Sequence, residues 1–308
     1  AHVVAEVTDG VERASLREME RQWQVANLLP ADLVEAKSLA GSRCEHAWRT
    51  QRKANDWQGF LVNFREVVKY TRQEATLLAE ATGLSKYDAL VAKYEPGMNG
   101  ATIERMFNEL KQWLPSLIKQ VQAKQANETV IKPTGVFPVD SQRALGLEVM
   151  GLLGFDFEAG RLDVSTHPFC GGVAEDVRIT TRYREDDFVQ AMMGIVHETG
   201  HARYEQRLPR EWVHLPLGQA RSMGVHESQS LSFEMQLGRS AAFLQLIAPL
   251  VKKHLGDQAA FAPDNLGKIY TRVKPDFIRV DADELNVLPL REYGMNVPED
   301  GLYTLEDV

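Results

Sequence analysis

Apolar residues recur at spacings of three and four through most of residues 9–154, which is the period of an amphipathic α-helix. Clear examples are the series from Phe60 to Leu78 and from Ile103 to Val121. The period is interrupted at 29–32, 82–85 and 95–97, where proline, glycine and capping residues occur. We therefore predict about five helices with short connections in the first half of the chain.

Residues 160–183 differ in character, because two runs rich in β-branched residues flank a link that contains Gly171 and Gly172. This pattern predicts a β-hairpin. Helical periodicity returns after Asp187 and continues intermittently to about Lys274, and no internal repeat interrupts it. We expect residues 1–308 to form a single, mostly α-helical domain with a small β-sheet.

Charge and cysteine usage limit the classes of partner. The 308-residue chain has a formal net charge of −8, so no overall positive field favours nucleic acid or anionic lipid. Cys44 and Cys170 are far apart and neither belongs to a CxxC pair. The amino terminus has no basic segment followed by an apolar core, and no run approaches 18 apolar residues. We expect a cytoplasmic protein without membrane or nucleic-acid partners.

The segment around His197 has the HExxH pattern. On a helix, His197 and His201 lie one turn apart on one face, so both imidazoles can bind one Zn²⁺ ion. Glu198 would project beside the open coordination position and act as the general base that takes a proton from the attacking water. This pattern predicts a zinc hydrolase, and the same ligand types also accept Co²⁺ or Mn²⁺.

A site with two histidines needs a third protein ligand. A second helical pattern begins at Ser222, and Glu227, 26 residues after His201, is the first candidate. His226 and Glu234 are rivals. Glu234 lies seven residues after Glu227 on roughly the same helical face, so it could instead accept a hydrogen bond from a ligand imidazole.

Five ordered sequence blocks resemble the carboxypeptidase Taq family of metallocarboxypeptidases. They are HPF at 167–169, DVRIT at 176–180, HETGH at 197–201, HESQ at 226–229 and IRVDAD at 278–283. The resemblance implies a mostly α-helical fold with a deep groove beside the small sheet, a bound zinc or similar divalent ion, a homodimer, and release of single residues from the carboxyl ends of peptides. It also implicates Glu227 as the third ligand.

A carboxypeptidase must recognise a free α-carboxylate, and the planar guanidinium of arginine suits that group. The family blocks contain Arg178 and Arg279, which we expect to bind the terminal carboxylate. Asp176, two positions before Arg178 on a strand, could orient it from the same face. His167 either approaches the substrate or caps the turn before Pro168.

The sequence departs from the family pattern near its carboxyl end. The expected GxxQDxHW block and a tyrosine-bearing segment are missing, and residues 285–292 read like two distant pieces joined. We therefore expect a chain that is incomplete at its carboxyl end and shortened at its amino end. Two other functions stay open: an oligopeptidase or endopeptidase with the same zinc site, and a catalytically impaired peptide-binding scaffold.

Overall fold

The computed structural model describes residue 7, residues 9–165 and residues 168–273. Two compact units can be distinguished, one reaching to Leu114 and the other lying within Pro115–Pro275. The prediction of a single domain stays a prediction. Among the described residues, no helix is both long enough and apolar enough to cross a membrane.

The first unit is built from helices whose ends follow the sequence signals. They are α2 (Gly10–Leu28), α3 (Ala31–Ala54), α4 (Trp57–Thr82), α5 (Lys86–Val91) and the first part of α6 (Gly100–Gln125). Asp9 caps α2 by accepting hydrogen bonds from two backbone N–H groups, and α4 ends where Gly83 adopts a left-handed conformation (φ 72°). The predicted breaks at 29–32, 82–85 and 95–97 are confirmed.

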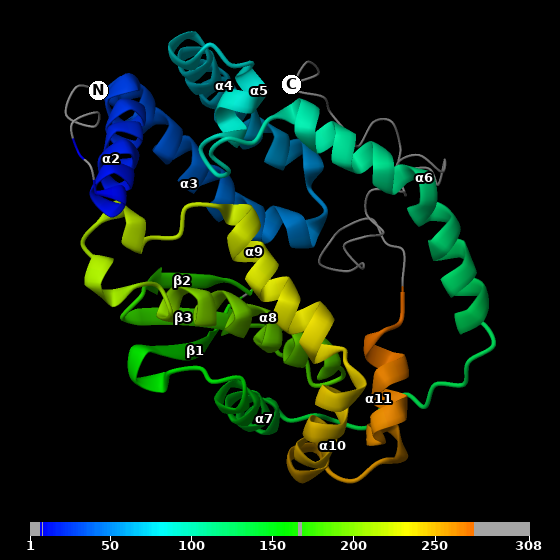
Figure 1. The fold of residues 1–308 in the computed structure, drawn as a ribbon. Helices are drawn as coiled ribbons and strands as arrows, with labels where there is room; N and C mark the ends of the chain where they lie inside the picture. Colours follow the sequence, from blue (N-terminus) through cyan, green and yellow to red (C-terminus); the bar gives the residue numbers. More distant parts are fainter. Residues whose placement is uncertain (1–6, 8, 166–167, 274–308) are drawn as a thin grey trace. The chain divides into compact units, whose positions relative to one another are not determined.

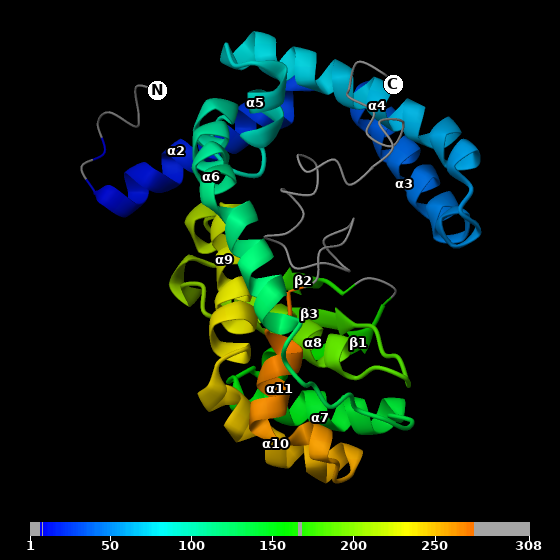
Figure 2. The same ribbon diagram turned by 90° about the vertical axis from the view of Figure 1, so that its right-hand side faces the viewer.

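Helices α3 and α4 pack side by side in this unit (Figure 2). A buried ion cluster ties them together, because the Glu74 carboxylate, almost fully enclosed, binds both Lys37 and Lys93. Burial alone would raise the pKa of Glu74, but the hydrogen bonds from the two ammonium groups outweigh it and lower the pKa.

The second unit carries the sheet and the remaining helices. Its main elements are α7 (Val139–Leu152), β1 (Gly160–Val164), β2 (Cys170–Val173), β3 (Asp176–Thr181), α8 (Val189–Gln206), α9 (Met223–Leu231), a π-helix (Ser232–Gly238), α10 (Ala241–Leu255) and α11 (Pro263–Tyr270). Short 3₁₀ turns occur at Phe157–Ala159, Arg210–Trp212, Pro216–Gly218 and Ala259–Phe261. Helix α9 runs alongside α8 (Figure 1).

The sheet corrects the hairpin predicted from the sequence. Its strand order is β1-β3-β2, with β1 parallel to β3 and β2 antiparallel to β3. Cys170–Val173, within the predicted link, is itself a strand that pairs antiparallel with β3, whereas the two β-branched runs pair in parallel and form no hairpin with each other. The alternation of residues predicts strands, but it does not determine which strand pairs with which or in which direction.

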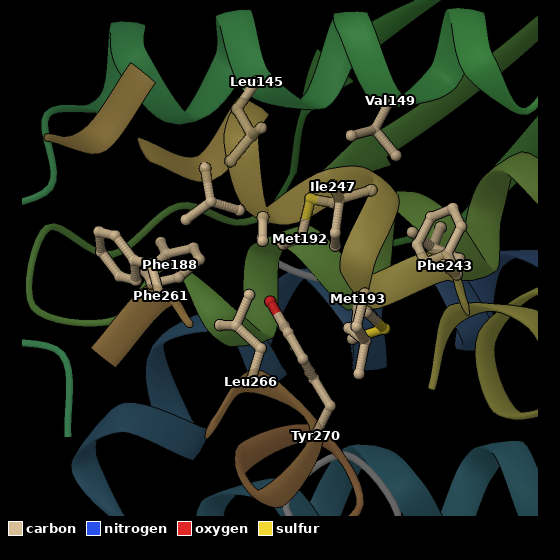
Figure 3. Packing of buried hydrophobic residues seen from close by; sticks show 14 of the residues in the cluster. Leu145, Val149, Phe188, Met192, Met193, Phe243, Ile247, Phe261, Leu266 and Tyr270 are labelled. Carbon is tan, nitrogen blue, oxygen red and sulfur yellow. The ribbon is translucent and has the colours of Figure 1, made fainter. Parts of the chain in front are cut away.

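Helix α8 lies between two hydrophobic clusters. One contains Met192 and Val196 of α8 together with side chains from α7, α10 and α11 (Figure 3). The other contains Ile195 and Ala202 of α8 together with β3. Because both sides of α8 are buried in apolar packing, the helix is held rigidly, and its polar residues occupy the remaining surface.

Candidate metal centre

His197 and His201 lie one turn apart on α8, as the sequence predicts, and both side chains are mostly buried. Their ring centroids are 5.0 Å apart, with the planes inclined at 79°. The neighbouring Val196 and Ala202 are fully buried in the two clusters that flank α8. The packing of α8 therefore fixes where the two imidazoles lie.

Glu227 on α9 reaches the two imidazoles. Its Oε2 atom lies 3.1 Å from His201 Nε2 and 3.8 Å from His197 Nε2. Helix α9 begins at Met223, and the hydroxyl of its N-cap residue Ser222 accepts a hydrogen bond from the Val225 N–H, so the predicted start of this helix is confirmed.

The close approach of α9 depends on a glycine in the HExxH segment. A Cβ atom at Gly200 would lie 2.6 Å from Ser230 Cα and 2.8 Å from the Gln229 carbonyl oxygen, both backbone atoms of α9. A side chain at this position would push the two helices apart. Gly200 thus lets the backbone of α9 pack directly on α8, which brings Glu227 within reach of both histidines.

Glu234 lies behind His197. Its Oε2 atom is 2.9 Å from His197 Nδ1, and its Oε1 atom accepts a hydrogen bond of 2.7 Å from Arg239 Nη2. A carboxylate can only accept, so Nδ1 of a neutral His197 carries the proton and Nε2 keeps a lone pair. The predicted hydrogen bond between Glu234 and an imidazole of the HExxH segment is confirmed, whereas the role of His197 as a metal ligand stays a prediction.

The charges around His197 shift its pKa and that of Glu234 in opposite directions. Burial lowers the pKa of His197, but the carboxylates of Glu234, Glu198 and Glu227 outweigh this effect and raise it. Burial raises the pKa of Glu234, but its hydrogen bonds with His197 and Arg239 outweigh this and lower it. Glu234 is therefore held as a carboxylate.

The three residues left open as third ligand occupy different places. Glu227 faces the Nε2 atoms of both histidines, whereas Glu234 contacts the far nitrogen of His197. His226 contacts the far nitrogen of His201, with 2.6 Å between the two Nδ1 atoms. Only Glu227 shares the space that the two Nε2 atoms face.

The donor set fits a divalent metal ion. Two imidazole nitrogens and one carboxylate oxygen, from His197, His201 and Glu227, lie within 4.8 Å of one another. In the described part of the chain, no other group of three His, Cys, Asp or Glu side chains has this arrangement. Nitrogen and oxygen ligands of this kind suit zinc and neighbouring first-row metals.

Glu198 is buried on α8 next to His197, and its charge acts on that imidazole. It also acts on Cys170 of β2. Burial, together with the Glu198 and Glu205 carboxylates, raises the pKa of the Cys170 thiol to about 12. Cys170 is therefore a neutral thiol, and the role of Glu198 as the general base stays a prediction.

Arg178 lies on β3, the central strand of the sheet. Val177 and Ile179 pack with Ile195 of α8, so Arg178, between them on β3, projects from the opposite face of the strand. Asp176 accepts hydrogen bonds from its Nε and Nη2, the shorter being 2.6 Å, which confirms the predicted contact. In the described part of the chain its side chain bonds Asp176 and neither histidine, so the role of Arg178 in substrate binding stays a prediction. His167 and Arg279 lie outside the described residues.

Two contacts of the site were missed at the sequence level. Arg239 binds Glu234 from five positions further on, a separation brought together by the π-helix but not by an α-helix. Glu205 accepts a hydrogen bond of 2.8 Å from His226 Nε2. Its position four residues after His201 was a usable signal, since it places both on one face of α8.

A cavity of about 590 Å³ lies at the carboxyl end of α8 and is lined by Arg203, Arg207 and Arg210, among others. None of the three clustered metal-ligand candidates lines it. The deep groove implied by the family resemblance therefore stays a prediction.

Residues 2–288 match the family described as carboxypeptidase Taq (M32) metallopeptidase. The chain belongs to this family. Thermostable carboxypeptidase 1 of Thermus thermophilus is 36% identical over 281 residues, covering 88% of this chain and 55% of that protein. Carboxypeptidase 1 of Bacillus subtilis is 35% identical over 274 residues, covering 86% and 53%.

Solved M32 structures share the fold. Metallocarboxypeptidase 1 of Trypanosoma cruzi superposes with a TM-score of 0.85 and 46% identity, covering 94% of this chain and 58% of that one. The chain spans about half the length of the curated relatives it matches. The resemblance seen in the five sequence blocks is thus confirmed, as is the mostly helical fold with a small sheet.

Proposed function

We propose that this M32 chain carries the catalytic core of a zinc-dependent metallocarboxypeptidase, which releases single residues from the carboxyl ends of peptides. The observation that carries the proposal is the convergence of His197 Nε2, His201 Nε2 and Glu227 Oε2 next to the buried Glu198. The names of the relatives, which are carboxypeptidases, support the same activity.

In this proposal His197, His201 and Glu227 hold the ion. Glu234 orients His197 by accepting the Nδ1 proton, so that the Nε2 lone pair is available for coordination. A bound divalent ion would polarise the scissile carbonyl and acidify a water molecule in the site. Zinc is our first assignment, and cobalt or manganese would suit the same ligands.

Glu198 is the proposed general base. It takes a proton from the water molecule as the water oxygen bonds to the scissile carbonyl carbon. The same proton then passes to the amine nitrogen as the C–N bond breaks. The shortened peptide is left with a new carboxyl group, and the released amino acid with a free amine. Glu198 is enclosed, and this favours proton transfer within the site over exchange with bulk water.

Recognition of the free carboxylate is assigned to Arg178 and Arg279, with His167 as a further substrate contact. The Arg178 guanidinium is half exposed and fixed by Asp176, so it is preorganised to bind a second carboxylate. The homodimer and the cytoplasmic location stay predictions.

Two variants test the assignment of roles. Substituting His201→Ala should abolish stoichiometric metal binding, measured by elemental analysis after dialysis against zinc, cobalt or manganese. Glu198→Gln should keep the metal and lose about 10²–10⁴-fold in turnover, since general-base transfer typically contributes that much. Full metal content in the first variant would refute the ligand set, and unchanged turnover in the second would remove Glu198 from the mechanism.

The position of cleavage tests the reaction class. Mass spectrometry of a digested peptide should show loss of single carboxyl-terminal residues, and a carboxyl-amidated copy of the same peptide should resist. Internal cleavage of the amidated peptide would instead indicate an endopeptidase. Metal binding without cleavage of either peptide would indicate a peptide-binding scaffold.

A further inference from the structure

A hydrogen-bonded chain extends from His201 away from the metal-ligand cluster. His201 Nδ1 lies 2.6 Å from His226 Nδ1, and His226 Nε2 lies 2.8 Å from Glu205 Oε1. His201 and Glu205 are four residues apart on α8, so they share one face of that helix. His226 enters from α9 and bridges them.

The chain determines the tautomers of both imidazoles when they are neutral. The Glu205 carboxylate only accepts hydrogen bonds, so His226 Nε2 must carry a proton and donate it. His226 Nδ1 then has a lone pair and must accept from His201 Nδ1. The Glu227 carboxylate, 3.1 Å from His201 Nε2, favours a proton on that nitrogen instead, but a neutral His201 with its proton there would leave two lone pairs facing each other across the 2.6 Å between the Nδ1 atoms. The closer contact places the proton of His201 on Nδ1.

The His226 ring is also held from two sides. It packs against the His201 ring at 4.7 Å and against the Tyr204 ring at 5.0 Å, with the Tyr204 plane inclined at 82°. Its backbone N–H bonds the Ser222 carbonyl oxygen at the start of α9. The ring therefore has little freedom to turn away from His201.

We propose that Glu205 and His226 are positioning residues that hold His201 in the Nδ1–H tautomer and thereby present its Nε2 lone pair to the metal ion. The inference rests on the proposed function, in which His201 is a metal ligand. The two histidines of the HExxH segment are supported differently. Glu234 binds His197 directly, whereas Glu205 acts on His201 through His226.

Two substitutions at position 226 separate the hydrogen bond from packing. His226→Leu removes the acceptor for the His201 proton. His226→Asn keeps one, because an asparagine Oδ1 is attached at the same distance along the side chain as a histidine Nδ1. The control is His254→Leu, which removes a comparable histidine–carboxylate contact, His254 to Glu148 at 2.7 Å, on α10 of the same unit.

The first measurement is a long-range ¹⁵N correlation spectrum of the metal-free protein, taken well above the ordinary imidazole pKa of about 6.5. It distinguishes Nδ1–H from Nε2–H imidazoles. We expect the Nδ1–H form of His201 in the unmodified protein, in His226→Asn and in His254→Leu, and a mixture of forms in His226→Leu. An Nε2–H form of His201 in the unmodified protein would overturn the proposal without any variant.

The second measurement is the zinc Kd by competition with a chelator. His226→Leu should weaken binding by about 10–100-fold, the range typical for loss of a residue that supports a metal ligand. His226→Asn should recover most of the affinity, and His254→Leu should leave the Kd unchanged. An equal loss in His254→Leu would show a general structural effect and would refute the positioning role.

The outcomes also separate this inference from the proposed function. If the unmodified protein binds no stoichiometric metal, or if His201→Ala binds as well as the unmodified protein, the proposed metal site itself is wrong. If the unmodified protein binds metal through His201 but His226→Leu changes neither the spectrum nor the Kd, only the positioning role is wrong.

Discussion

Substitution of Gly200 by alanine tests how closely the geometry of the metal site depends on the contact between α8 and α9. The new Cβ would lie 2.6 Å from Ser230 Cα, whereas carbon atoms in good contact are about 3.5 Å apart. The atoms in the way belong to the backbone of α9 and cannot rotate aside. Helix α9 must therefore move by about 1 Å relative to α8.

The movement has consequences for both stability and metal binding. Overpacking of this size costs about 1–3 kcal/mol, and the better helix propensity of alanine returns about 1 kcal/mol, so we expect a net loss of about 0–2 kcal/mol. Glu227 lies on α9 and moves with it. Metal–ligand distances hold within about 0.2 Å, so we expect the Kd for zinc to weaken by about 10–100-fold.

Gly194 on the same helix provides the matched control. A Cβ there would lie 3.7 Å from Thr181 Oγ1 and 4.0 Å from Pro168 Cγ, which is ordinary contact. Gly194→Ala should therefore be as stable as the unmodified protein or up to about 1 kcal/mol more stable, with an unchanged Kd. Urea unfolding of the metal-free proteins and chelator competition measure the two quantities. If Gly200→Ala matches the Gly194→Ala control in both, the argument from helix contact is wrong.

Three further predictions concern substrate recognition, acid stability and the core. Arg178→Lys keeps the charge but loses the bidentate fork, so kcat/KM should fall more for free-acid peptides than for amidated ones, and an equal fall would assign Arg178 to structure. The pKa of Glu74 is lowered in the folded protein, so its ion cluster stabilises the fold above the ordinary glutamate pKa of about 4.3 and loses that contribution as the pH falls further. In urea unfolding between pH 3 and pH 7, Glu74→Gln should lose less stability in acid than the unmodified protein. If the free energy of unfolding falls equally with pH in both proteins, Glu74 does not contribute to the acid sensitivity. Phe261 is fully buried beside Phe188 in the cluster of Figure 3, with the ring centroids 5.4 Å apart. Phe261→Ala should lower the free energy of unfolding in urea by about 3–5 kcal/mol, whereas a loss below about 1 kcal/mol would show that the core refills the space.

The sequence by itself determined the local features of this protein. The three-and-four spacing gave the helices of the first unit, and proline, glycine and capping residues gave their ends, since both depend on neighbours within a few residues. The same local geometry put His197 and His201 on one face of α8 and capped the start of α9 with Ser222. Five short blocks in order were enough to indicate the family.

Only the tertiary structure decided how these elements meet. The parallel pairing of β1 with β3 depends on which edge of the sheet β2 occupies, and the alternation of residues along a strand does not specify that edge. The separate positions of Glu227, Glu234 and His226 depend on the contact of α9 with α8 at Gly200 and on the π-helix that follows. A helical period fixes which residues share a face, but the distance and rotation between two helices are set by the side chains that pack between them.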